Sequence, residues 1–200
     1  MKRLFVFLCT LLLTLSVGAQ TEATARKILN KTAALINRRG GASANFTATG
    51  KFGTTAGSLA IKGNKFYART GQAVVWYNGK TQWTYLKKSQ EVNVSNPTEA
   101  QQQSMNPYKF VNIYKNGFKL SSKAVGGGWQ VHMQAANNKR SIKEMYVTVD
   151  KNYYPKTIKM RQANGWITIN VTNFRAKNLS DGVFTFNAKE YPHAEVIDLR

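Results

Sequence analysis

Hydrophobic and polar residues change their spacing once along this chain, close to residue 40. Over residues 21–39 the apolar positions recur every three to four residues, which predicts an amphipathic helix. From Ser43 onward they recur at every second residue, which predicts strands with one apolar face. The tally is about eleven short strands in hairpin order, separated by Asn-Gly and Gly-rich turns. The pattern predicts a mainly β fold, an antiparallel barrel or strongly curved sheet whose concave face is covered by helices.

The stretch at residues 65–94 is the most apolar set of hairpins. Asn78-Gly79 lies between two aromatic-rich runs and predicts a type I′ turn, in which both central residues have positive φ. We assign Trp83 and Tyr85, which follow this turn, to the apolar face inside the sheet. A slip of one residue would turn both side chains to solvent.

A second, shorter helix is expected after the strands of this region. Asn106 is its predicted cap, and Phe110 and Ile113 belong to its apolar face. Phe184 and Phe186 are expected to form the last short strand, before an acidic and apolar tail.

The first nineteen residues have the composition of a secretory signal peptide. Lys2-Arg3 precedes an apolar run at residues 4–15, and small residues at 17–19 end it. The apolar run is shorter than the ~20 residues that a membrane-spanning helix needs. We therefore expect cleavage before Gln20, export across a membrane, and one domain over residues 20–200. Cys9 is the single cysteine, so the exported chain has none for disulfides.

The exported chain is strongly basic. Removing Lys2 and Arg3 leaves 27 basic residues against 9 acidic ones, a net charge of +18. Export argues against nucleic acid as the partner and favours anionic lipid head groups, acidic glycans or acidic proteins. The lysines are scattered along the chain, so a solvated surface explains the same pattern.

Motifs for catalysis or metal binding are missing from the sequence. Gly79-Lys80-Thr81 resembles the end of a phosphate-binding loop, but Val74 stands where the first glycine belongs. His132 and His193 are far apart and have no metal-ligand spacing, and no G-x-S-x-G elbow occurs. We therefore expect neither an enzyme nor a cofactor or metal. The abundant Trp, Tyr and Phe side chains either fill the core or leave a cavity for an apolar ligand.

Five motifs together carry a resemblance to a known family. They are a G-x-L-x-[IV]-K strand (57–62), an x-N-G-K-x-x-W-x-Y hairpin (77–85), an N-P helix start (106–110), a D-x-x-x-Y-P-x-x-I-K segment (150–159) and a closing F-T-F…Y-P-x-x-E-V-I-D-L-R (184–200). Over nearly the whole exported sequence the chain is similar to the LolA family of periplasmic outer-membrane lipoprotein carriers, particularly the LolA-like proteins of Bacteroidetes.

The resemblance implies an incomplete β-barrel closed by a helical lid, whose cavity shields lipoprotein acyl chains. It implies a monomer that receives acylated lipoproteins from an inner-membrane ABC transporter and delivers them to an outer-membrane acceptor. Two alternatives stay open. One is a periplasmic sensor or regulator that binds lipids or other hydrophobes on the same fold, and the other is a basic envelope protein with a filled core.

One departure from the family concerns the lid. In relatives an Arg-Pro follows the lysine of the first motif, and that arginine ties the lid to the barrel, whereas here Gly63-Asn64 follows Lys62. Arg69 is the candidate substitute. The phase of the apolar positions gives eleven candidate residues for the acyl-chain cavity: Ile28, Leu35, Ile36, Phe110 and Ile113 from the helices, and Phe46, Leu59, Ile61, Phe66, Trp83 and Tyr85 from the sheet.

Overall fold

The computed structural model describes residues 21–99, 101–102 and 111–200. Twelve strands in this part of the chain form one sheet. They are β1 (Ala42–Gly50), β2 (Gly53–Lys62), β3 (Lys65–Thr70), β4 (Ala73–Tyr77), β5 (Gln82–Leu86), β6 (Glu91–Ser95), β7 (Phe118–Val125), β8 (Gly128–Ala135), β9 (Glu144–Asp150), β10 (Pro155–Gln162), β11 (Gly165–Ala176) and β12 (Glu195–Asp198). Alternating burial along most of them fits a sheet with two unlike faces.

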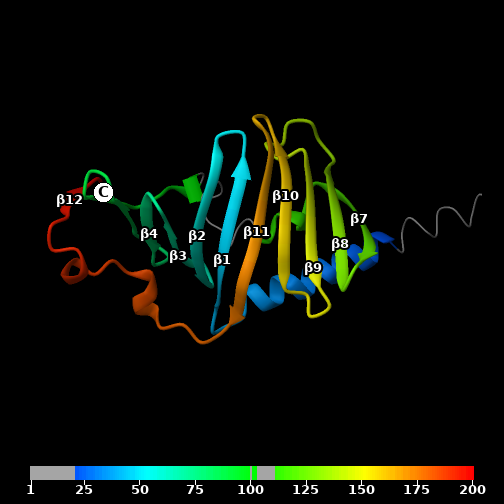
Figure 1. Ribbon diagram of the computed structural model, residues 1–200, viewed down its shortest axis with the longest axis horizontal. Helices are drawn as coiled ribbons and strands as arrows, with labels where there is room; N and C mark the ends of the chain where they lie inside the picture. Colours follow the sequence, from blue (N-terminus) through cyan, green and yellow to red (C-terminus); the bar gives the residue numbers. More distant parts are fainter. Residues whose placement is uncertain (1–20, 100, 103–110) are drawn as a thin grey trace, which may run out of the picture.

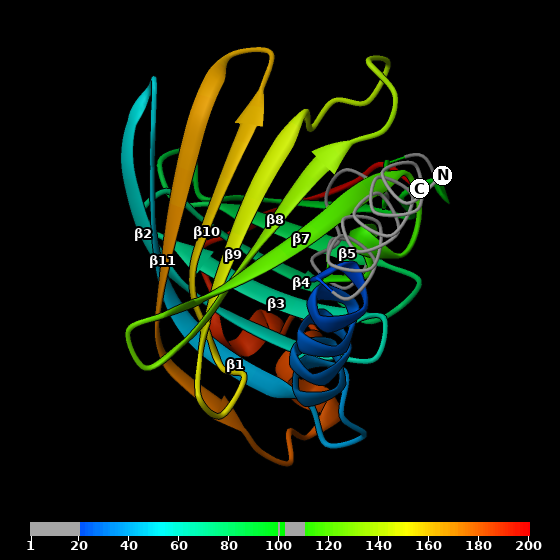
Figure 2. The same ribbon diagram turned by 90° about the vertical axis from the view of Figure 1, so that its right-hand side faces the viewer.

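The sheet is open and strongly curved. Its order is β12-β6-β5-β4-β3-β2-β1-β11-β10-β9-β8-β7, so the edge strands are β12 and β7. Every neighbouring pair is antiparallel except β12 with β6. Strands β3 and β4 lie toward one end of the long axis and β7 to β10 toward the other (Figure 1), and the two sets run in clearly different directions (Figure 2). The predicted incomplete antiparallel barrel is confirmed.

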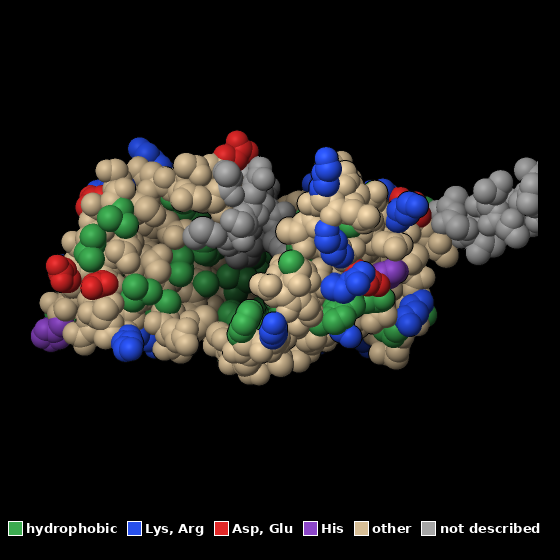
Figure 3. Space-filling view, turned by 90° about the horizontal axis from the view of Figure 1, so that it is seen from above, with side chains coloured by type: hydrophobic (Ala, Val, Ile, Leu, Met, Phe, Trp, Pro, Cys, Tyr) green, Lys and Arg blue, Asp and Glu red, His purple; other side chains and the backbone are tan. Residues whose placement is uncertain are grey.

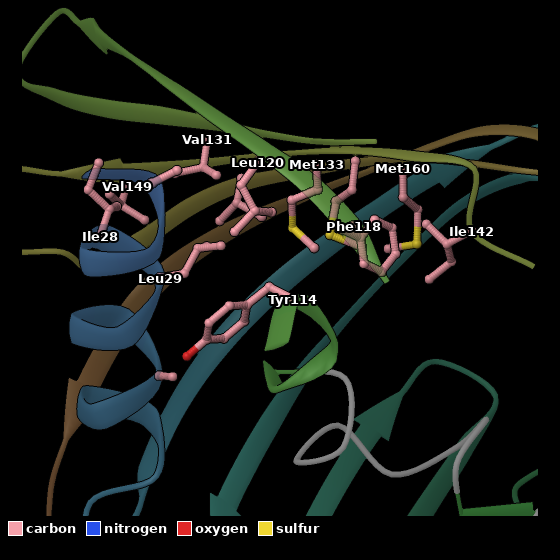
Figure 4. Close-up of a cluster of buried hydrophobic side chains, with 14 residues drawn as sticks. Ile28, Leu29, Tyr114, Phe118, Leu120, Val131, Met133, Ile142, Val149 and Met160 are labelled. Carbon is pink, nitrogen blue, oxygen red and sulfur yellow. The ribbon is translucent and has the colours of Figure 1, made fainter. Parts of the chain in front are cut away.

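A helix at residues 21–36 lies along the concave face of the sheet (Figure 2). Its apolar stripe, which includes Ile28 and Leu29, packs on the half of the sheet formed by β7 to β10. Figure 4 shows these two side chains pointing toward Leu120, Val131 and Val149. We call this the helix-covered half. The members of its core are at most 9% exposed, so it is filled by its own side chains.

Polar contacts from the second half of the helix hold it in this position. The Thr32 hydroxyl donates a hydrogen bond to the Tyr153 carbonyl oxygen at 3.0 Å, and Lys31 Nζ lies 3.0 Å from the Tyr153 hydroxyl. The Tyr114 hydroxyl donates to Asn30 Oδ1 at 2.7 Å. Tyr114 belongs to a 3₁₀ turn, η1 (Ile113–Lys115), which lies where the second helix was expected to end. Residues 106–110 of that expected helix lie outside the described part of the chain.

The C-terminal segment, residues 177–191, crosses the convex face of the sheet. The expected strand at Phe184 and Phe186 is wrong, because residues Asp181–Phe184 form a 3₁₀ turn, η2. Phe184 is fully buried and packs with Ala60 and Leu179 on the convex face. A second short turn, η3 (Ala188–Glu190), follows, and the tail then adds β12 to the sheet edge.

Two lysines attach this segment through one carboxylate. Lys62 Nζ lies 2.9 Å from Asp181 Oδ1 and donates to the Leu179 carbonyl oxygen at 2.8 Å, and Lys65 Nζ lies 2.9 Å from Asp181 Oδ2. Hydrogen bonds from Lys62 and then Lys65 lower the pKa of Asp181 to about 2. Because the folded pKa is below the ordinary 3.8, the stabilisation is present above pH 4 and is lost as the pH falls toward 2.

We therefore expect Asp181→Asn to lower the Tm slightly at pH 5 and to have a much smaller effect near pH 2. Thermal unfolding of both proteins across this pH range measures the difference. Glu195→Gln is the matched control, since Glu195 is exposed and makes no ion pair within the described residues. A Tm difference that stayed constant from pH 5 to pH 2 would contradict the assignment.

Candidate functional site: the concave face of the sheet

The strand registers define which side chains lie on the concave face outside the helix-covered half. Ile61 pairs with Phe66, and Phe66 pairs with Tyr77, so these three share a face. They form a buried cluster, against which Ile36 from the last turn of the helix packs. We call strands β2 to β6 the open half.

The open half keeps apolar side chains that are only partly buried. Leu59, Ala68 and Val75 lie on the concave face next to the buried cluster, and none of them is fully covered. Seen from above, the molecule is hollowed between its two halves, and hydrophobic side chains are visible within the hollow (Figure 3). Partly buried apolar surface inside a hollow is the surface an apolar ligand would cover.

Phe46 extends the same surface onto β1. It pairs with Gly57 on one side and Val171 on the other, so its ring lies on the concave face. A Cβ atom at Gly57 would lie 2.8 Å from the Phe46 ring and 2.2 Å from the Arg69 carbonyl oxygen. Glycine at the start of the G-x-L-x-[IV]-K motif therefore makes room for this ring and for the neighbouring strand.

The concave face becomes polar on β5 and β6. Tyr77 pairs with Gln82 and Val75 pairs with Thr84, so Gln82 and Thr84 lie on this face, with Leu86 at the end of β5. Gln82 is buried, and its Nε2 donates to the Thr84 hydroxyl at 3.3 Å. Burial raises the pKa of the Tyr77 phenol above its ordinary 10.0, so this group stays neutral. The hollow thus has an apolar wall and a polar margin on β5 and β6.

Trp83 and Tyr85 are not on the concave face, so their predicted position is wrong. Trp83 pairs with Trp76, and the Tyr85 ring lies 4.7 Å from the ring of Tyr191 in the C-terminal segment. The turn also differs from type I′, because Asn78 does not have a positive φ. Its side-chain Oδ1 instead accepts hydrogen bonds from the backbone N–H groups of Lys80 and Thr81, at 3.0 and 2.9 Å.

The Arg69 lid-latch prediction is also wrong. Arg69 pairs with Val74 and Ser58, which places its side chain on the convex face, away from the helix. The helix is attached by Thr32, Lys31 and Asn30 instead. Sequence periodicity gave no signal for these contacts, because two of them join the helix to a loop residue 121 or 122 positions away.

The remaining predicted residues divide between the two halves. Ile36, Leu59, Ile61 and Phe66 come together in the open half. Ile28 belongs to the filled core of the helix-covered half, and Ile113 packs against that core. Leu35 is partly buried on the helix, and Phe110 lies outside the described residues.

A second hollow lies on the convex face, under the C-terminal segment. Its volume is about 460 Å³, and its lining includes Asn45, Ser58, Arg175 and Lys177 together with Tyr67 and Leu179. Two cations and several hydrogen-bonding groups make this lining less favourable to an acyl chain than the apolar side chains of the concave face. The concave face is therefore the better candidate for an apolar ligand.

Other kinds of site find no support in the described ranges. No group of three or more His, Cys, Asp or Glu side chains there could hold a metal ion. No helix among residues 21–99, 101–102 and 111–200 is long and apolar enough to cross a bilayer.

A curved, open antiparallel sheet with an apolar hollow beside one helix defines a class of carrier and binding proteins for lipids and other hydrophobes. The family model described as "Outer membrane lipoprotein carrier protein LolA" matches residues 15–164. The chain belongs to this family, and the predicted resemblance is confirmed. Among curated proteins, no significant match is found.

Solved structures resemble this one at low sequence identity. An uncharacterised conserved protein from Thermus thermophilus is 12% identical, with a TM-score of 0.60 over 88% of this chain and 99% of that one. A putative outer-membrane lipoprotein-sorting protein domain from Vibrio parahaemolyticus is 11% identical, with a TM-score of 0.44 over 82% and 97%. The first likeness shows the fold alone, and the second is too weak to carry an argument.

Proposed function

We propose that this protein is a periplasmic carrier that binds the acyl chains of lipoproteins on its concave face and moves them from the inner to the outer membrane. The observation that carries the proposal is the hollow of the open half, with partly buried Leu59, Ala68 and Val75 beside Ile36. The family match supports a carrier in preference to a basic protein with a completely filled core.

Physical chemistry explains why lipoproteins need such a surface. Each CH₂ group of an acyl chain gains ~0.8 kcal/mol on leaving water, so one sixteen-carbon chain gains on the order of 10 kcal/mol. A diacylated or triacylated protein would not cross an aqueous compartment without a partner that covers these chains. The apolar wall of the open half would cover them, while Gln82 and Thr84 would face the polar end of the lipid.

The two halves of the sheet have different tasks in this proposal. The helix-covered half is filled and fixes the helix, so the helix acts as a wall of the hollow more than as a moving lid. Cargo enters and leaves along the open half without disrupting the main core. The chain has no nucleotide motif, so an inner-membrane ABC transporter would supply the energy for loading and an outer-membrane acceptor would receive the cargo. No residue has a proposed catalytic role.

Native mass spectrometry of the protein purified from its own cell envelope tests the bound cargo. We expect complexes with acylated lipoproteins, and we expect depletion of the protein to leave lipoproteins in the inner membrane. Normal lipoprotein sorting after depletion, together with a single free lipid bound to the purified protein, would overturn the carrier proposal. It would favour the sensor or regulator instead.

A further inference from the structure

Three connections between strands lie at one end of the sheet. They join β1 to β2 at residues 51–52, β8 to β9 at 136–143 and β10 to β11 at 163–164. The registers bring them together, because Thr49 at the end of β1 pairs with Thr168 near the start of β11. All three lie at the top of the molecule in two perpendicular views (Figures 1 and 2). We call this end the upper edge.

The three connections of the upper edge carry only positive charges, and Glu144, the acid that directly follows one of them, is paired with Arg161. Its three connections contain Lys51, Lys139, Arg140 and Lys143 and no acidic residue. Within the described residues, none of these four side chains makes an ion pair. At the opposite end of β7 to β10, the turns at 126–127 and 151–154 contribute one cation, Lys151, whereas the segments before β1 and after β11 contribute Arg38, Arg39 and Lys177.

The upper edge also exposes two large aromatic side chains. Phe52 at the tip of the first hairpin is 86% exposed, which is the highest value among large hydrophobic side chains of the described residues. Trp166, at the start of β11, is 37% exposed, and Lys159 Nζ lies 4.6 Å from its ring centroid. Exposed aromatic rings beside lysines are typical of surfaces that lie at the boundary between water and lipid.

We propose that the upper edge docks on an anionic lipid bilayer, with Phe52 entering the headgroup region and the four cations contacting lipid phosphates. Charge complementarity selects this partner, because anionic headgroups attract clusters of lysine and arginine. Figure 3 views the molecule from the side of the upper edge, and the hollow of the concave face is visible from that side. Docking would therefore present the hollow to the membrane. Docking is a property of the empty protein and needs no lipoprotein cargo.

Co-sedimentation with vesicles tests this docking with a matched pair of variants. Lys51→Glu/Lys139→Glu changes the upper edge, and Lys123→Glu/Lys151→Glu makes the same change in net charge near the opposite end. The four lysines have no ion pair in the described part of the chain. We expect the first pair to weaken binding to phosphatidylcholine vesicles that contain phosphatidylglycerol by about tenfold or more, and the second pair to have a much smaller effect.

Phe52→Ala tests the aromatic contribution without changing charge. Because the side chain is almost fully exposed, its loss will leave the fold intact, and we expect weaker vesicle binding that persists when salt screens the charges. Equal losses for the two charge variants would mean diffuse attraction and would overturn the docking edge. Absence of binding to anionic vesicles, or unchanged binding by Phe52→Ala, would also overturn the proposal, and the latter would favour an acidic protein partner.

Discussion

Replacing Phe184 by alanine is expected to lower the free energy of unfolding by about 3–5 kcal/mol, because a fully buried aromatic side chain is removed. For a chain of this size such a loss lowers the Tm by roughly 10 °C. Phe184 fixes the C-terminal segment to the convex face through Ala60 and Leu179. Urea and thermal unfolding of the purified protein measure both quantities.

The control makes the same substitution at an exposed position. Phe52 is 86% exposed, so Phe52→Ala should change the free energy of unfolding by less than about 0.5 kcal/mol. A similar small effect at Phe184 would mean that the C-terminal segment detaches easily and that the sheet is stable without it. The family match ends at residue 164, so this test also examines a region that the match does not cover.

Replacing Leu59 by glutamine is expected to weaken the binding of a fluorescent fatty acid by about tenfold to a hundredfold. The new amide would have to lose its water when an acyl chain covers the open half, at a cost of about 1–3 kcal/mol. Leu59 is already partly exposed on the concave face, so we expect the protein to fold with a nearly unchanged Tm. Fluorescence titration and thermal unfolding of the same samples measure the two effects separately.

Ser58→Gln is the matched control for this prediction. Ser58 is the neighbouring residue of the same strand, and its side chain lies on the convex face, opposite Arg69. The same amide at this position should leave fatty-acid binding unchanged. If both variants bound equally well, or if Ser58→Gln were the weaker binder, the acyl-chain site would not be on the concave face.

The architecture of this protein is largely encoded in local spacing. The helical stripe that includes Ile28 predicted a helix from residue 21, and the helix is there, although it ends at residue 36 and not at 39. The alternation of Leu59 with Ile61 predicted a half-buried strand and placed both side chains correctly beside Phe66. These features depend on neighbours close in sequence, so periodicity is enough to find them.

The face of Trp83 could also have been predicted, and the error has a simple origin. In a hairpin whose loop has an even number of residues, Trp83 lies opposite either Val74 or Trp76. Val74 and Trp76 lie on the opposite face of β4 from Val75 and Tyr77. A two-residue loop and a four-residue loop therefore both put Trp83 and Tyr85 on the face away from Phe66. Aromatic character suggested a ligand site, whereas counting residues across the turn would have given the correct face.

The convex-face contacts could not be predicted from the sequence. Lys62 and Asp181 are separated by 119 positions, and no periodic pattern links them. The apolar alternation of Phe184 and Phe186 resembles a strand, but burial against Ala60 and Leu179 outweighs strand propensity there. The parallel pairing of β12 with β6 likewise depends on the path of the whole C-terminal segment.

The meeting of β1 with β11 in the middle of the sheet has a consequence for the order of folding. Strands β1 to β6 and β7 to β11 are each consecutive hairpins, but Phe46 pairs with Val171 across a large part of the chain. Closing so long a loop costs conformational entropy, so we expect each set of hairpins to form quickly and the seam between them slowly. The hollow exists only once this seam is complete. A partly folded chain therefore has no finished site that could capture a lipid too early.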